Sequence, residues 1–91
     1  MKIFIIGNVA SEKSTLAKKL SKQTNITHYE IDLIVHDDTL HLHRSLNQQF
    51  ALIKTINQNN DWIIEGTLRN DLDVLLELAD KIIFLDPPYH I

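Results

Sequence analysis

The chain has 91 residues, 44% of them hydrophobic, which is enough for one small domain with a packed core. Its formal net charge is -3, so the composition lacks the excess of basic residues that is typical of proteins binding nucleic acid or an anionic membrane surface. It contains no cysteine, which excludes disulfides and thiolate metal sites, and its apolar runs are too short to span a bilayer.

The first element in chain order is a strand from Ile3 to Ile6, with the apolar sequence IFII. Such an unbroken apolar run is typical of a strand that is buried on both faces. A helix is predicted next, from Ser14 to Lys22, because Leu16, Ala17 and Leu20 fall on one side of it.

Between this strand and this helix, the sequence follows most of the phosphate-binding pattern G-x-x-x-x-G-K-[ST]. Gly7, Lys13 and Ser14 fill three of its four defining positions. In such a loop, backbone N–H groups hold an anion, the lysine reaches the outer phosphates and the serine hydroxyl binds Mg²⁺. The predicted nucleotide-binding residues are Gly7, Asn8, Val9, Ala10, Ser11, Glu12, Lys13, Ser14 and Thr15.

Glu12 stands where this pattern has its second glycine. A glycine there permits a backbone conformation that costs other residues about 1–2 kcal/mol, so strain is expected at Glu12. Its carboxylate also repels a polyphosphate unless Lys13 or Mg²⁺ neutralises it. The alternative is an ordinary strand–turn–helix whose serine and lysine side chains cap the helix or are solvated.

The second strand is predicted from Ile26 to Ile31, at a sheet edge because its pattern is amphipathic. Residues Leu33 to His43 are the least regular and are expected to form a loop or a small mobile element. His36, His41 and His43 do not have the spacing of a tight zinc site. A substrate-contact loop and a polar surface loop are the remaining interpretations.

Two further helices and two buried strands complete the pattern. One helix is indicated by apolar residues at helical spacing that stop before the polar cluster NQNN, namely Leu42, Leu46, Phe50, Ile53 and Ile56. The other has a stripe interpreted as core packing, namely Leu68, Leu72, Leu75, Leu76 and Ala79. The strands are predicted at Trp62 to Ile64 and at Ile82 to Leu85.

Strands that alternate with helices predict a single α/β domain over residues 1–91, with a parallel sheet, right-handed crossovers and helices on both faces. Ligands of open α/β sheets bind beyond the carboxyl ends of the strands. Asp32, Glu65 and Asp86 follow or end three of the strands, so we expect them to share a crevice with Lys13.

Each of these positions has a functional interpretation. Glu65 is suited to hold Mg²⁺ through water, together with Ser14. Asp32 is suited to orient or deprotonate a substrate hydroxyl, and Arg69 to bind an acceptor phosphate. The alternatives are a helix cap or loop carboxylate for the acids and a solvated surface residue for the arginine. For Asp86 the turn is preferred, because Asp-Pro commonly opens one.

Almost the whole chain resembles the adenylate-kinase-related P-loop proteins often called DNA topology modulation proteins. The resemblance rests on MKIFIIG with KSTLAKKL, on HYEIDLI, and on DWIIEGTLRNDLDVLLELADKIIFLD. It implies a three-layer P-loop NTPase fold in which Gly7, Lys13, Ser14 and Thr15 bind ATP and Mg²⁺.

The resemblance also implies roles at the acceptor side. Asp32 matches an acidic residue that faces the acceptor in related small-molecule kinases, and Arg69 matches an arginine that binds the acceptor phosphate. Glu65 and Gly66 match an Asp-Gly pair. The implied catalytic residues are Lys13, Asp32 and Arg69, and the implied metal-binding residues are Ser14 and Glu65.

Proteins of this family continue into a lid with arginines, another strand and a final helix. The present chain stops at Ile91, so we expect its fold to lack these parts. The last strand then leaves an open sheet edge, through which a second copy can pair.

Two functions follow from these features. The first is an ATP-dependent small-molecule or nucleotide kinase with an unidentified acceptor. The second is a degenerate, non-catalytic phosphate-loop domain that binds nucleotide weakly or not at all and acts through a protein partner. No signal peptide is recognisable after Met1, and we expect a cytoplasmic protein with neither a membrane nor a nucleic-acid partner.

Overall fold

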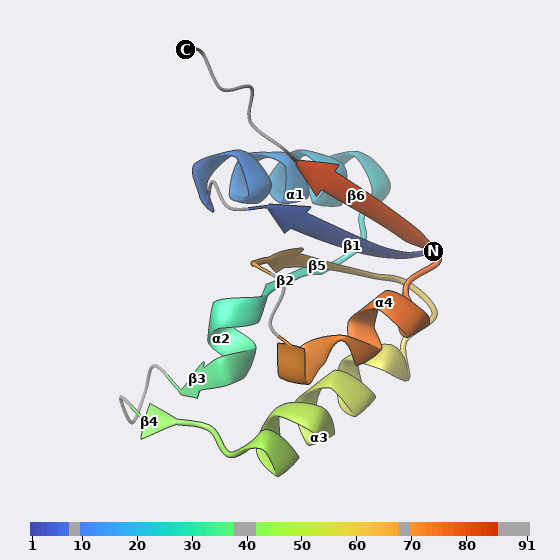
Figure 1. Cartoon of the computed structure of the whole chain (residues 1–91). Coiled ribbons are helices and arrows are strands. Elements are labelled where there is room, and N and C mark those ends of the chain that lie inside the picture. Colours follow the sequence, from blue (N-terminus) through green and yellow to red (C-terminus); the bar gives the residue numbers. More distant parts are fainter. Residues whose placement is uncertain (8–9, 38–41, 68–69, 86–91) are drawn as a thin grey trace.

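A computed structural model describes residues 1–7, 10–37, 42–67 and 70–85. Four parallel strands form the central sheet in the spatial order β2-β5-β1-β6 (Figure 1). Their bounds are Lys2–Gly7 for β1, His28–Glu30 for β2, Trp62–Gly66 for β5 and Lys81–Leu85 for β6. The predicted α/β class with a parallel sheet is confirmed, as is the edge position of the second strand.

Helices cover both faces of this sheet, as expected. Helix α1 (Ala10–Thr24) lies on one face, and α2 (Ile31–Val35), α3 (Leu46–Asn57) and α4 (Val74–Leu78) lie on the other (Figure 1). A 3₁₀ turn, η1 (Asn70–Leu72), precedes α4, so the single predicted helix around Leu72 is in fact two short pieces.

The alternation along β1 explains why its sequence is apolar throughout. Phe4 and Ile6 pack in the cluster beneath α2, α3 and α4, whereas Ile3 and Ile5 pack with Ala17 of α1. Successive strand residues point to opposite faces, and both faces are covered here, so every position of the strand favours an apolar side chain.

Helix α3 begins later than the sequence pattern predicted. Ser45 caps it through a capping box with Gln48, and Leu42 lies outside the helix in a short strand. Ile53 is buried as predicted, but Phe50 is 40% exposed. The predicted stripe is therefore only half correct, because the buried side of α3 is formed by Gln49, Ile53 and Ile56, and Phe50 lies beside it.

The segment from Leu33 to His43, expected to be irregular, contains regular elements. It includes the end of α2 and an antiparallel pair of short strands, β3 (His36–Asp37) and β4 (Leu42–His43). The guanidinium of Arg44 donates to the carbonyl oxygens of Leu33 and, at 3.2 Å, of His36, which satisfies carbonyl groups at the end of α2.

Strand β6 forms the sheet edge opposite β2. Ile82 and Phe84 are 46% and 67% exposed and lie on the same face of the sheet as Phe4 and Ile6, their register partners. Among the described residues, no helix is long and apolar enough to cross a bilayer.

Candidate functional site

A polar pocket of about 190 Å³ lies at the carboxyl ends of the strands. The chain leaves β1 toward α1 on one face of the sheet and leaves β5 toward η1 and α4 on the other (Figure 1). Adjacent strands whose connections diverge in this way open a crevice between them, the usual ligand position in open α/β sheets. The pocket is lined by Lys13, Ser14, Glu30, Asp32, Glu65, Gly66 and Thr67.

The junction between β1 and α1 differs from the predicted phosphate loop. Helix α1 begins at Ala10, whereas the sequence pattern placed its start at Ser14. Glu12 therefore lies within the helix, and the expected strain at that position is absent: Asn25 is the one non-glycine residue with positive φ in the described ranges. Glutamate favours helix over loop far more than glycine does, which accounts for the earlier start.

Lys13 lies in α1 with only 4% of its surface exposed. Its ammonium donates one hydrogen bond to the carbonyl oxygen of Gly7, at the end of β1. It donates another to the hydroxyl of Thr67, just beyond β5, at 3.2 Å. The charge of this buried group is thus held at the junction of two neighbouring strands.

Glu65 is the second buried charged group of the pocket, with 4% of its surface exposed. Its Oε2 atom has no hydrogen-bond partner among the described residues. Burial raises the pKa of its carboxyl group, and the nearby carboxylates of Glu30 and Asp32 raise it further, against the opposing effects of Lys13 and His28. An unpartnered buried carboxyl oxygen is costly, and a cation or a proton in the pocket would relieve that cost.

Asp32 lies in the first turn of α2, where it is exposed and borders the pocket. Thus four predicted site residues lie around one space: Lys13, Ser14, Asp32 and Glu65. Thr15, also predicted to bind nucleotide, is exposed on α1 and is not among the residues that line this pocket.

Sequence reasoning missed two residues of the pocket, Glu30 and Thr67. Glu30 is the register partner of Glu65 on the adjacent strand, so both side chains project from the same face of the sheet. Thr67 follows Glu65 by two positions, and the two-residue repeat of a strand was a usable signal for it.

Two glycines allow neighbouring elements to approach closely here, β1 with β6 and β5 with α2. A Cβ atom on Gly7 would lie 2.8 Å from the carbonyl oxygen of Leu85 on β6. A Cβ atom on Gly66 would lie 2.7 Å from the Cβ of Ile31, at the start of α2. Packing against β6 is therefore sufficient to explain why a glycine stands at Gly7, the first position of the phosphate-loop pattern.

Several of the remaining residues singled out in the sequence cannot be placed relative to this pocket. Asn8, Val9, Arg69, His41 and Asp86 lie outside the described residues. His36 and His43 face each other across the β3–β4 pair with ring centroids 4.9 Å apart. Within residues 1–7, 10–37, 42–67 and 70–85, no group of three or more His, Cys, Asp or Glu side chains is arranged to hold a metal ion.

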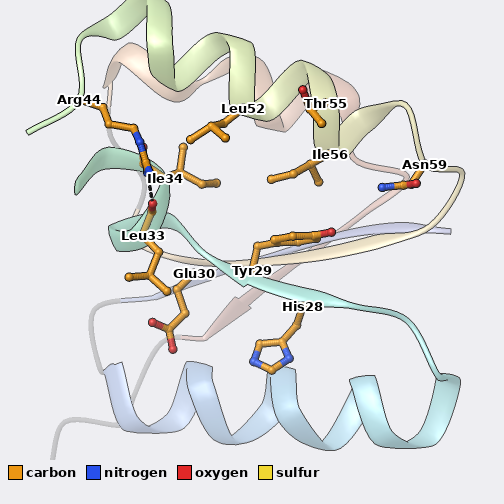
Figure 2. Close-up of a pocket in the computed structure, with 10 residues that line it drawn as sticks. All are labelled: His28, Tyr29, Glu30, Leu33, Ile34, Arg44, Leu52, Thr55, Ile56 and Asn59. Carbon is orange, nitrogen blue, oxygen red and sulfur yellow. Dashed lines mark hydrogen bonds between the residues drawn. The ribbon is translucent and has the colours of Figure 1, made fainter. Parts of the chain in front are cut away.

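A second cavity, of about 440 Å³, lies beside the edge strand β2 (Figure 2). Tyr29 and Ile56 line this cavity, and Glu30 borders both the cavity and the polar pocket. The guanidinium of Arg44 points to the backbone of α2, with its hydrogen bond to Leu33 drawn dashed in Figure 2. The positive charge of Arg44 thus already interacts with backbone carbonyl groups of the fold.

No protein-family model matches the chain, and a search of curated proteins finds no significant match to its sequence. The class of protein is therefore defined by geometry. It is an α/β protein with an open parallel sheet and a polar pocket where β1 and β5 end.

Proposed function

We propose that the chain has a P-loop NTPase fold and is a phosphotransferase of the nucleotide-kinase type that uses ATP and Mg²⁺. The observation that carries this proposal is the convergence on one pocket of a buried lysine, a serine and a buried glutamate whose Oε2 atom has no hydrogen-bond partner in the described part of the chain. Lys13, Ser14 and Glu65 come from two elements separated by some fifty residues of sequence, so their meeting reflects the fold and not a local motif.

The pocket suits the phosphate end of a nucleotide. Cavities that enclose a drug-sized ligand are about 300–1,000 Å³, so a space of about 190 Å³ admits the outer phosphates but not the base and sugar. In this proposal the ammonium of Lys13 binds a β- or γ-phosphate oxygen. Phosphoryl transfer then depends on positioning and on neutralising charge, without a covalent enzyme intermediate.

The donor set fits Mg²⁺ better than a metal held by protein ligands alone. Mg²⁺ keeps several water ligands and is bound by one or two carboxylates together with substrate phosphates. The Ser14 hydroxyl and the free Oε2 of Glu65 would hold it in this way. When bound, the ion neutralises charge on the phosphates.

The acceptor is proposed to lie on the α2 side of the pocket. Asp32 borders the pocket from α2 and is suited to orient an acceptor hydroxyl. Arg69, just outside the described residues, is proposed to bind an acceptor phosphate.

One observation favours the second function, a non-catalytic domain that acts through a partner. Residues 10–12 belong to α1, so this part of the segment that would wrap the phosphates is helical. A helix N-terminus still presents free N–H groups to an anion, but fewer than a loop that encircles it. This would weaken nucleotide binding without removing the lysine.

Titration calorimetry with ATP and Mg²⁺ separates the two functions. We expect Glu12→Gly to tighten binding by about tenfold, since glycine disfavours the helical start by about 1 kcal/mol and removes a carboxylate near the phosphates. Lys13→Ala in the same background should abolish the gain. If neither the parent nor Glu12→Gly binds ATP, the kinase proposal is wrong and the partner-dependent function is favoured.

A further inference from the structure

Thr67 occupies a position between the two strands that flank the pocket. It follows directly after β5 (Trp62–Gly66), and its hydroxyl is 3.3 Å from the carbonyl oxygen of Gly7, to which it donates. The oxygen atom of the Thr67 hydroxyl also accepts a hydrogen bond from the ammonium of Lys13 at 3.2 Å, and Lys13 donates a further one to the Gly7 carbonyl oxygen. Lys13, Thr67 and the Gly7 carbonyl therefore form a closed triangle of hydrogen bonds across β1 and β5.

This triangle restricts a side chain that is flexible in most settings. A lysine ammonium has three N–H donors on a stem of four carbons and loses considerable conformational entropy when it is fixed. The described residues supply two acceptors, Gly7 and Thr67, for the three donors of Lys13. One donor is left for a ligand, and Lys13 lines the polar pocket.

We propose that Thr67 is a positioning residue, which holds the ammonium of Lys13 in the orientation that receives a phosphate group. The proposal rests on the phosphate-binding function proposed above. It assigns to Thr67 no contact with the reacting atoms, and its effect is exerted through Lys13. Without the hydroxyl, the ammonium keeps only the Gly7 carbonyl and reorients more freely.

Two substitutions distinguish the hydroxyl from the shape of the side chain. Thr67→Val keeps the branched shape and removes both hydrogen bonds, whereas Thr67→Ser keeps the hydroxyl. Thr55→Val serves as the matched control, because Thr55 is an exposed threonine of α3 whose hydroxyl donates to the carbonyl of Ala51 within its own helix. Thermal unfolding of each variant checks that the fold is retained.

The first readout does not require nucleotide. Each protein is treated briefly with an amine-acetylating reagent, and acetylation of Lys13 is measured by mass spectrometry relative to the exposed Lys18 and Lys22. We expect Thr67→Val to raise the relative rate at Lys13 severalfold, and Thr67→Ser and Thr55→Val to leave it near the parent value. An unchanged rate in a folded Thr67→Val variant would overturn the proposal.

The second readout is the affinity for ATP and Mg²⁺, measured by calorimetry. Hydrogen bonds to charged groups contribute enough that Thr67→Val should weaken binding about tenfold, with Thr67→Ser close to the parent. Equal affinities in the parent and Thr67→Val would overturn the proposal. If the parent does not bind ATP, the proposed phosphotransferase function fails, and the acetylation rates alone decide whether Thr67 positions Lys13.

Discussion

Gly66 and Ile31 approach each other so closely that a Cβ atom on Gly66 would lie 2.7 Å from the Cβ of Ile31. Gly66 ends β5 beside the buried Glu65, and Ile31 begins α2 directly before Asp32. Their contact brings the end of the strand and the start of the helix together. The spacing of the two acidic residues around the pocket thus depends on a glycine with no side chain.

We expect Gly66→Ala to lower the free energy of unfolding by about 1–3 kcal/mol, the usual cost of inserting an extra methyl group into a packed site. Urea denaturation of the variant and the parent measures this loss. A companion substitution, Ile31→Gly, removes the Cβ, Cγ1 and Cδ1 atoms that would lie 2.7, 3.0 and 3.1 Å from the new methyl group.

The double variant tests the assigned cause. If the methyl group clashes with Ile31, the losses from Gly66→Ala and Ile31→Gly should sum to more than the loss in the double variant. Strict additivity would contradict a direct clash and would indicate that Gly66 is needed for another reason.

Glu65 is expected to make the stability of the protein fall with rising pH. Its pKa is raised in the folded state, first by burial and then by Glu30 and Asp32, so the folded protein holds this proton more tightly than the unfolded chain does. The free energy of unfolding contributed by Glu65 therefore decreases as the pH rises from the ordinary pKa of the group to the raised one.

Urea denaturation across acidic to neutral pH measures this effect. Glu65→Gln should decline less with rising pH than the parent, because glutamine has no proton to lose. Glu77→Gln, at an exposed position of α4, provides the control and should follow the parent curve. Parallel curves for the parent and Glu65→Gln would contradict the raised pKa.

Arg44 is expected to stabilise α2 and the β3–β4 pair through backbone hydrogen bonds. Its guanidinium donates to the carbonyl oxygens of Leu33, Ile34 and His36. Arg44→Met keeps the apolar stem but removes these donors, and should lower the free energy of unfolding by about 1–3 kcal/mol. Lys54→Met, at an exposed position of α3, should change it by less than about 0.5 kcal/mol.

Strand β6 is the place where we expect a second copy to associate. Its edge is unpaired within the described sheet, and the exposed Ile82 and Phe84 extend along one face of it. Phe84→Lys should reduce self-association in analytical ultracentrifugation without lowering the melting temperature appreciably. Phe50→Lys, on the exposed side of α3, is the matched control. Loss of association only in that control would place the interface on α3.

Much of the fold was predictable because continuous apolar runs, typical of buried strands, alternate along the chain with apolar residues at helical spacing. The runs IFII and WII are apolar at every position, which identified β1 and β5 as strands buried on both faces. The rule that ligands bind at the carboxyl ends of parallel strands then placed Asp32 and Glu65 near Lys13. Both steps depend on local pattern and on a general property of such sheets.

The start of α1 could not be read in the same way. The motif around Lys13 predicted a loop up to Ser14, but local helix propensity without the glycine extends α1 back to Ala10. The exposure of Phe50 was missed for another reason: the buried side of α3 includes the polar Gln49, which a search for apolar residues passes over.

The sequence by itself determined the four strands of the central sheet, the parallel α/β class and which polar residues would stand near one edge of the sheet. Only the tertiary structure decided that Oε2 of Glu65 is buried with no hydrogen-bond partner among the described residues, and that the hydroxyl of Thr67 accepts a hydrogen bond from Lys13. These facts depend on how β1, β5 and α2 approach one another. That approach is set by contacts between residues far apart in the sequence, such as Gly66 with Ile31, which no local pattern records.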